Sequence, residues 1–371
     1  MINDIIEYNK NRNKNLLKIK YKLLCESPFR FFRGTNHLFY NDIPPDSFLL
    51  DKNSPTTIQC GDLHLENFGT FKAENRLIYF DMNDFDESFV GPILLDITRL
   101  STSVFLAKDI IGIDYKEANK LIKILLKSYK LYLSNGLIRS IEKDSSRGSI
   151  KLLMSELSKR KRKKFIDNRI IKNKIKLTDK IFKCGLKIKN KLKQKFKNDF
   201  DILDVSIRVA GTGSIGVERY MMLIKRNHKK YLIDMKESSP SSFTGKFIFK
   251  NNSDKLITLQ KYTQSNSPDF LKEVFFNGKW FTIKELQPTN DKLNLCNIPK
   301  NKLVSLMEDI GSIVAFNNHR SSGKMGTSSS DELMNFGKQL DINNIIGYSQ
   351  NYYKKVLVYH KEWVKNYTEK I

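Results

Sequence analysis

"CGDLHLENFG" (residues 60–69) and "DMNDFDE" (residues 81–87) place six acidic residues within a short span of the chain. The sequence as a whole is basic, with 65 Lys and Arg against 40 Asp and Glu, so this local excess of carboxylates runs against the composition. Hard cations such as Mg²⁺ prefer oxygen ligands of this kind. The two segments therefore indicate a site that holds cations.

The spacing of the two segments favours phosphoryl-transfer chemistry. Asp62 and Asn67 lie five residues apart on a loop that follows an expected strand at 56–60. The runs "NFGTF" and "RLIYFDM" flank a polar tip and predict a hairpin, which would return Asp84 to the side of that loop. One carboxylate to orient a hydroxyl, with an amide oxygen and a second carboxylate for Mg²⁺, is the minimum set for moving a phosphoryl group.

Two other interpretations of these acids remain open. "GDLH" resembles part of a metallophosphoesterase motif, in which Asp and His bind a pair of metals. That chemistry needs more nearby histidines than a chain with only five can supply. Asp and Asn also commonly cap their own backbone in polar turns, although two such turns in succession, each after an apolar strand, are less typical of capping.

A second segment, "GTGSIG", contributes Gly211, Gly213 and Gly216. A dinucleotide-binding turn would need a crossover helix after these glycines, and only "VERYMMLI" separates them from the next polar turn. A glycine-rich hairpin is the better prediction, because its backbone N–H groups can approach phosphates without obstruction by a Cβ. Lys236 ends the following strand, "YLIDMKES", from which an ammonium could reach the phosphates, although most lysines at strand ends are simply solvated.

The rest of the chain is mostly helical, then β-rich from about residue 201, then helical again from about 301. A lysine-rich helix is expected at 3–25, with "ESPFRFFRG" ending it. Pro92 is expected to open another helix. Residues 136–200 carry no strong turn signals and are expected to be helical.

Composition limits the class of protein. The four cysteines are far apart and no apolar run approaches the ~20 residues of a membrane span, so a cytoplasmic protein without a membrane span is expected. The N-terminus lacks the layout of a signal peptide, although export by a signal-less route stays open. Residues 151–200 hold 19 Lys and Arg against 4 Asp and Glu, which predicts either a surface for a polyanion or a solvated helical face.

Five segments together resemble the bacterial family called domain of unknown function 2252: "SPFRFFRG", "CGDLHLENFG", "FDMNDFDESFVGPILLDITRL", "VAGTGSIG" and "MKES". That family is similar to the protein-kinase-like superfamily, especially the aminoglycoside and choline phosphotransferases. The resemblance implies an α+β, two-lobed kinase-like fold in which the order of the parts is circularly permuted. The implied parts are a catalytic-loop and metal-binding part at 1–135, a basic helical segment at 136–200, a β-rich nucleotide-binding lobe at 201–298 and completing helices at 299–371.

The resemblance also implies a role for each matching residue. Asp62 would be the catalytic aspartate, Asn67 and Asp84 would bind Mg²⁺, and Asp96 would brace the catalytic loop. Gly211, Gly213 and Gly216 would cover the phosphates of ATP, and Lys236 would pair with them. The supporting residues are His64, Asp81, Asp86, Arg30 and Arg33. Asp81 and Asp86 are rivals or helpers of Asp84 as metal ligands. The two arginines would either bind phosphate or an acidic substrate, or anchor the N-terminal helix through ion pairs, for example with Asp96.

The sequence departs from the kinase pattern in three respects. The catalytic loop precedes the glycine hairpin, and Cys60 stands where phosphotransferases usually carry a histidine. No Glu lies between Gly245 and Asp269, where the partner of the lysine should fall, so either Gln260 or Asp254 would substitute or Lys236 would be held differently.

The leading hypothesis is an ATP- and Mg²⁺-dependent phosphotransferase that acts on an unidentified hydroxyl or amino acceptor, and the phosphotransferase-like catalytic loop favours a small molecule. The alternatives are a catalytically inactive nucleotide-binding or polyanion-binding scaffold, and a nucleotidyl transferase on the same fold.

Overall fold

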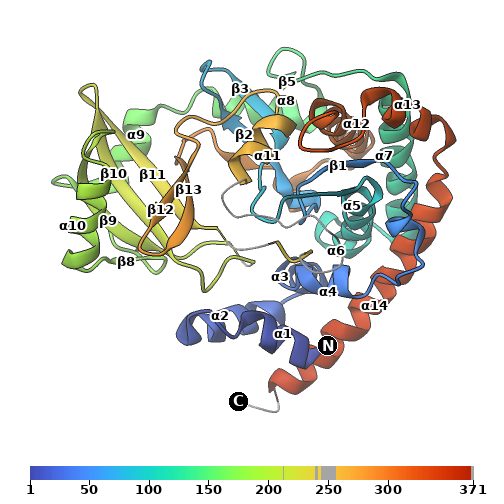
Figure 1. The fold of residues 1–371 in the computed structure, drawn as a ribbon, viewed down its shortest axis with the longest axis horizontal. Helices are drawn as coiled ribbons and strands as arrows, with labels where there is room; N and C mark the ends of the chain where they lie inside the picture. Colours follow the sequence, from blue (N-terminus) through green and yellow to red (C-terminus); the bar gives the residue numbers. More distant parts are fainter. Residues whose placement is uncertain (212, 239–240, 244–255, 369–371) are drawn as a thin grey trace.

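A computed structural model describes residues 1–211, 213–238, 241–243 and 256–368 of the chain, which adopt a mixed α+β fold (Figure 1). The helices within these ranges are α1 (Ile2–Asn9), α2 (Lys14–Leu24), α3 (Pro28–Gly34), α4 (Asn36–Asn41), α5 (Leu94–Leu106), α6 (Lys108–Ile111), α7 (Tyr115–Asn135), α8 (Gly148–Leu157), α9 (Arg162–Asp167), α10 (Leu186–Lys195), α11 (Leu256–Thr263), α12 (Leu303–Ser321), α13 (Ser330–Gln339) and α14 (Ile342–Thr368). The strands are β1 (Thr56–Gln59), β2 (Phe68–Lys72), β3 (Ile78–Met82), β4 (Phe89–Pro92), β5 (Ile141–Glu142), β6 (Ile170–Ile171), β7 (Lys174–Ile175), β8 (Ile181–Lys183), β9 (Asp201–Arg208), β10 (Arg219–Arg226), β11 (Lys229–Glu237), β12 (Lys272–Phe276), β13 (Lys279–Glu285) and β14 (Asp291–Lys292).

The largest sheet has six strands in the order β12-β13-β11-β10-β9-β8, and its pairs are antiparallel. The predicted meander of strands around the glycine segment is confirmed, since β9 pairs with β10 and β10 with β11. Val205, Met222, Ile233 and Phe281 project into one apolar core of this sheet. The sheet occupies one end of the molecule, and the long helices α5, α7, α12 and α14 occupy the other (Figure 1).

The prediction that residues 136–200 are wholly helical is wrong. The segment contains the short strands β5 to β8, and β8 extends the six-stranded sheet by pairing with β9. Its helix α10 ends beside the sheet, where Leu192 and Phe196 are buried. Strands of two or three residues are too short to show a pattern, and β5 and β8 pair with the distant strands β3 and β9, so the local sequence does not reveal them.

The expected helix at 3–25 consists of two helices. Asn13 begins α2, because its side-chain oxygen accepts the backbone N–H groups of Asn15 and Leu16 at 3.0 and 3.2 Å. The segment "SPFRFFRG", expected to end the helix, forms α3 instead. Ser27 caps α3 and Pro28 occupies the first helical position, where a missing N–H costs nothing.

A four-stranded sheet and a pair of strands connect the two ends of the molecule. The predicted hairpin is confirmed as β2 paired with β3, and β14 and β5 flank it. The predicted strand before the acidic loop is β1, which pairs with β4. Beside them α12 packs against α7, and Gly311 permits this contact because a Cβ there would lie 2.2 Å from the backbone oxygen of Leu125.

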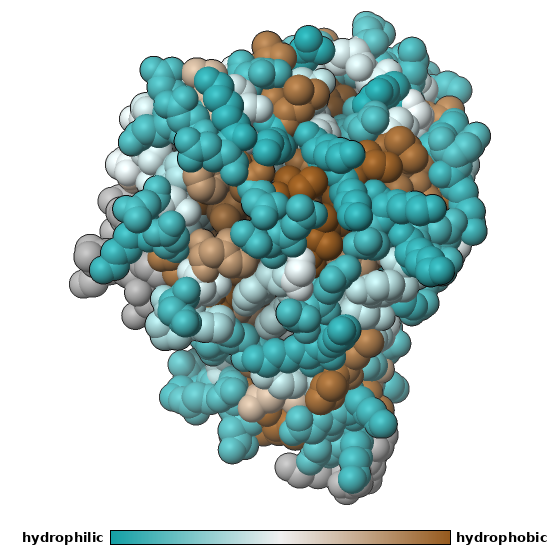
Figure 2. All heavy atoms as spheres, turned by 90° about the vertical axis from the view of Figure 1, so that its right-hand side faces the viewer, coloured by the Kyte–Doolittle hydropathy of each residue, from teal (hydrophilic) through white to brown (hydrophobic). Residues whose placement is uncertain are grey.

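The face that carries α13 and α14 is mostly hydrophilic, and its hydrophobic patches are interrupted by polar side chains (Figure 2). Within the described ranges, no helix combines the length and the apolar character that crossing a membrane requires.

Candidate functional site

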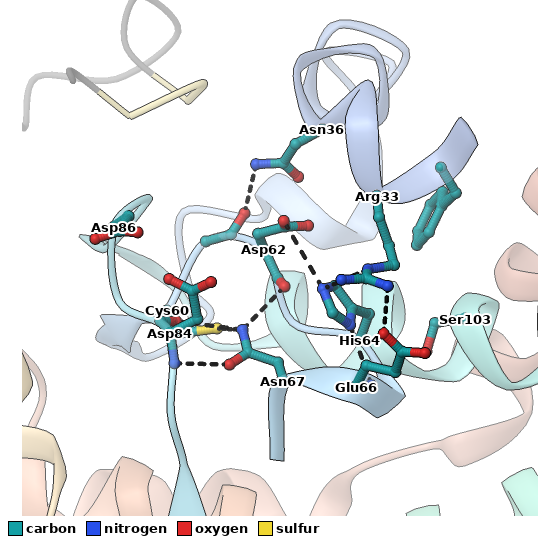
Figure 3. Close-up of polar contacts among 12 residues, drawn as sticks. Arg33, Asn36, Cys60, Asp62, His64, Glu66, Asn67, Asp84, Asp86 and Ser103 are labelled. Carbon is teal, nitrogen blue, oxygen red and sulfur yellow. Dashed lines mark hydrogen bonds and ion pairs between the residues drawn. The ribbon is translucent and has the colours of Figure 1, made fainter. Parts of the chain in front are cut away.

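The register of the strands brings the two acidic segments together. Phe68 at the start of β2 lies opposite Met82 at the end of β3, so Asn67 and Asp84 meet just beyond the hairpin. The Asn67 side chain connects both loops: its Nδ2 donates to the backbone oxygens of Asp62 (3.1 Å) and Asp84 (3.2 Å), and its Oδ1 accepts the N–H of Asp84 at 2.8 Å (Figure 3). Asn67 is 1% exposed, so it holds the loops from within.

Asp96 fixes the start of the acidic loop from the first turn of α5. Its carboxylate accepts the backbone N–H groups of Cys60 (2.6 Å) and Gly61 (3.1 Å). Burial raises the pKa of Asp96 to about 6, although these two hydrogen bonds act to lower it. Gly61 has φ +83°, and a Cβ there would lie 2.0 Å from the backbone oxygen of Glu87, so only glycine fits between the two loops.

Asp62 is held by Arg99, which is fully buried on α5. Nε and Nη2 of Arg99 donate to Oδ1 of Asp62 at 3.0 and 2.5 Å, and Nη2 also donates to the backbone oxygen of Phe32. The guanidinium stacks on the ring of Phe32, 3.9 Å from its centroid. Burial raises the pKa of Asp62, and the charge of Arg99 opposes this rise. Oδ2 of Asp62 has no contact with Arg99 and faces His64 (Figure 3).

Arg33 and His64 line the other side of Asp62. Arg33 forms an ion pair with Glu66, and its Nε lies 3.2 Å from Nε2 of His64. That ring nitrogen is 4.0 Å from Oδ2 of Asp62. Burial and the charge of Arg33 hold the pKa of His64 well below its usual range, so the ring is neutral.

Asp84 and Asp86 carry the remaining negative charge of the site, and Lys236 forms an ion pair with Asp86. Enclosure within the site would raise the pKa of Asp84, but the charge of Lys236 and a hydrogen bond with Asp86 outweigh it and hold that pKa below its usual range. Enclosure and the charge of Asp84 raise the pKa of Asp86. Among the residues that the structure describes, no three His, Cys, Asp or Glu side chains gather as a metal-binding cluster.

Two of the supporting residues lie outside this arrangement. Asp81 faces α12, where it accepts from Nδ2 of Asn317 at 2.8 Å and pairs with Arg320 at 3.3 Å. Arg30 pairs with Glu26 one turn earlier, on the surface. The suggested ion pair between either arginine of α3 and Asp96 is wrong, because Arg30 and Arg33 pair with the glutamates named here and above.

A single cavity of about 120 Å³ joins residues that are far apart in the sequence. Asp62, Asp84 and Asp86 line it from one side, and Gly211, Gly213 and Lys236 line it from the sheet; the other lining residues are Tyr8, Arg12, Lys20, Arg33, Gly34, Asn36, His64, Glu87, Ser214, Val217, Glu237 and Lys292. Gly216 does not line this cavity. Its φ is +98° and its Cα packs against Arg12, beside a neighbouring cavity.

Lys236 has a partner that the sequence pattern does not reveal. Gln260, one of the two suggested substitutes, donates to Gln264 instead, and Asp254 lies outside the described residues. Helix α11 carries no acidic residue, and Lys236 pairs with Asp86 of the acidic segment.

Arg99 and Lys20 were missed by the sequence reasoning. An arginine within the apolar helix sequence "LLDITRLSTSVFL" is a usable signal, because charged side chains are almost never fully buried without a partner. Lys20 carries no such signal, since it is one of many lysines in a lysine-rich helix.

The basic segment lies at a different cavity. Arg160 and Arg162, with Lys72, Arg76 and Lys229, line a hollow of about 340 Å³ that also contains Glu285. Arg160 pairs with Glu156 and Asp291 there, so part of its charge is already neutralised. Binding of a polyanion by this segment stays a prediction.

The comparisons with known proteins give one family. Residues 12–190 and 137–366 match the model of the family described as "Uncharacterized protein conserved in bacteria" (DUF2252). Neither a search of curated proteins nor a search of solved structures found a match. Since the two matched ranges cover most of the sequence, the chain belongs to the bacterial family of domain of unknown function 2252.

Proposed function

We propose that this protein is an ATP- and Mg²⁺-dependent phosphotransferase with a circularly permuted, two-lobed kinase-like fold. The observation that carries the proposal is the shared cavity, in which Asp62, Asp84 and Asp86 face Gly211 and Lys236. Kinase sites have four recurring parts: a catalytic aspartate, a metal-binding aspartate, a glycine-rich loop and a lysine on the third strand.

The arrangement of the sheet supports the nucleotide-binding part of the proposal. The glycine hairpin joins β9 to β10, Lys236 lies on the next strand, β11, and α11 follows it. Kinases have the same succession of glycine loop, lysine strand and helix. The acidic loops precede this succession here, as a circular permutation requires.

Asp84 and Asp86 are the side chains that fit Mg²⁺. Two carboxylates this close repel each other unless a proton or a cation lies between them, and Mg²⁺ is often held by one or two carboxylates together with phosphate oxygens. Asn67 uses its oxygen on the N–H of Asp84, so its role in this proposal is to hold the ligand loop. When bound, the metal would neutralise charge on the phosphates.

Asp62 is suited to accept the proton of the acceptor. Arg99 occupies Oδ1 and leaves Oδ2 directed at the cavity side that His64 and Arg33 line. A base must lie within hydrogen-bonding reach of the proton that it removes, so the acceptor hydroxyl or amine belongs beside Oδ2. The cavity is smaller than the ~300 Å³ of ordinary ligand sites, so in its present shape it would hold only part of a nucleotide.

Calorimetric titration of ATP, with and without Mg²⁺, tests the proposal. Wild-type protein should bind ATP only with Mg²⁺. Asp84→Ala should weaken this binding by at least roughly tenfold, because a carboxylate ligand of the metal is lost. Glu74→Ala, an exposed carboxylate of the β2–β3 turn, is the control and should bind as the wild type does.

If the wild type is folded and does not bind ATP, the proposal is wrong. If it binds, an acceptor screen with α- and γ-labelled ATP separates phosphoryl transfer from nucleotidyl transfer, and Asp62→Ala should abolish the transfer. Binding without transfer to any acceptor would favour the inactive scaffold.

A further inference from the structure

The N-terminal helices α1 and α2 bring two cations to the candidate site. Lys20 of α2 is fully buried, and Arg12 lies in the turn between the two helices. Nη1 of Arg12 donates to the backbone oxygens of Gly213 (2.6 Å) and Ile215 (3.1 Å), and the N–H of Asn13 donates to Gly216 at 3.3 Å. The N-terminal segment is thus attached to the tip of the glycine hairpin.

Lys20 has an unusual set of partners for a buried ammonium. Its Nζ donates to Oδ1 of the buried Asn9 at 2.8 Å and lies 3.4 Å from the backbone oxygen of Gly213. Both partners are neutral. Among the described residues, no carboxylate lies within ion-pair distance of Lys20 or Arg12. Buried charges are normally paired, so a buried lysine that lines a cavity and has no carboxylate within ion-pair distance indicates a missing anion.

Several other charged residues of the cavity are already paired, although Asp84, Glu87 and Lys292 line it without an ion pair within the described ranges. Lys236 pairs with Asp86, Arg33 pairs with Glu66, and Glu237 pairs with Lys279. Burial, and then the charge of Arg12, holds the pKa of Lys20 well below its usual range, and the charges of Glu87 and Asp62, which lie beyond ion-pair distance, oppose this effect only in part. An anion between Arg12 and Lys20 would relieve this repulsion.

We infer that Arg12 and Lys20 form an anion subsite that binds a phosphoryl group at the tip of the glycine hairpin. The inference rests on the proposed function and deepens it: the phosphoryl group is either the terminal phosphate of the nucleotide or a phosphate carried by the acceptor. Gly213 accepts from both cations and lines the same cavity as Asp62, so an anion held there lies where the transferred group and the acceptor meet.

Binding of Mg²⁺-ATP, Mg²⁺-ADP and inorganic phosphate to the full chain tests the subsite. Lys20→Gln removes the charge and retains a donor for Asn9, and Lys20→Arg retains the charge. Lys18→Gln removes an exposed lysine of the same helix and is the control. Arg12→Gln repeats the test at the second cation, which is only half-buried, and a thermal melt of each variant checks its fold.

We expect Lys20→Gln and Arg12→Gln to weaken phosphate binding by roughly tenfold to a hundredfold, as loss of a hydrogen bond to a charged group does. Lys20→Arg and Lys18→Gln should bind normally. If Lys20→Gln and Arg12→Gln weaken the binding of both phosphate and ATP but not the binding of ADP, the subsite holds the terminal phosphate. If ATP and ADP bind normally, and phosphate binding to the Mg²⁺-ADP form is lost, the subsite serves the acceptor.

Two results would overturn the inference, and they are distinguishable. In the first, the wild-type protein binds Mg²⁺-ATP, and the folded variants Lys20→Gln and Arg12→Gln bind ATP and phosphate as tightly as the wild type. The subsite is then wrong and the proposed function stands. If the wild type binds neither ATP nor phosphate, both fail.

Discussion

Asp62 acquires its orientation from side chains that the sequence places far from it. Asn67 belongs to the same short motif, but Arg99 comes from α5 and Arg33 from α3. The fully buried Arg99 is the positive charge that opposes the effect of burial on Asp62. One oxygen of Asp62 is thereby fixed and the other stays directed at the cavity, which is the arrangement that a positioned base requires.

Replacement of Arg99 tests this arrangement. In Arg99→Met, burial acts on Asp62 without the charge of Arg99 and the weaker effect of Arg33 still opposes it, so the pKa of Asp62 should rise further and the carboxylate should be protonated at higher pH. Under the proposed function, the acid limb of the pH–rate profile for ATP turnover should move to higher pH, with a rate loss on the order of 10²-fold or more at neutral pH. Arg30→Met is the control, because Arg30 pairs only on the surface. An unmoved acid limb in folded Arg99→Met would show that Arg99 does not tune Asp62.

Local pattern predicts the elements that it encodes and misses those that depend on distant partners. The β2–β3 hairpin and the strands around the glycine segment were predictable, because apolar runs mark their course and turn residues mark their ends. The two-residue strand β5 and the edge strand β8 were not, since their pairing partners, β3 and β9, lie far along the chain. Asp62, Asn67 and Asp84 belong to the first kind, whereas Lys20 and Arg99 reach the site only through helix packing.

Glycines in two helices provide a matched test of packing at the scale of elements. Gly311 lies where α12 meets α7, and a Cβ there would lie 2.2 Å from the backbone oxygen of Leu125. Gly311→Ala must push the helices apart, so it should lower the free energy of unfolding by roughly 2 kcal/mol or more. Gly347 of α14 has no atom within 4 Å of such a Cβ, so Gly347→Ala should be neutral or stabilise by up to about 1 kcal/mol. Urea unfolding compares the two, and equal changes would mean that α7 and α12 can separate freely.

At the scale of the molecule, the two ends of the chain pack together. Trp363 of α14 donates to the backbone oxygen of Tyr21 at 3.3 Å, and Tyr352 donates to Asp42 at 3.0 Å. Helix α14 lies along the N-terminal helices and α5 (Figure 1). The helical region is therefore built from both termini around an inserted sheet, which the succession of helical, β-rich and helical sequence predicts only in outline. The sequence does not predict the contacts that join the sheet to the helices, and only the structure shows them.

Glu285 lies where the chain leaves the six-stranded sheet for β14, and it makes the stability of the whole molecule depend on pH. It is 5% exposed, and burial together with the charge of Asp269 raises its pKa to about 7. Between pH ~4.5 and ~7 the folded state binds a proton that the unfolded state releases, so stability falls as pH rises through this range and stays low above it.

Glu285→Gln cannot ionise and should not lose this stability, so its advantage over the wild type should grow from near zero at pH ~4.5 to on the order of 3 kcal/mol at pH 8. Urea unfolding at several pH values measures it, with the exposed Glu74→Gln as a control that should follow the wild type. Parallel stability curves for Glu285→Gln and the wild type would show that Glu285 ionises in the folded protein as freely as it does in the unfolded chain.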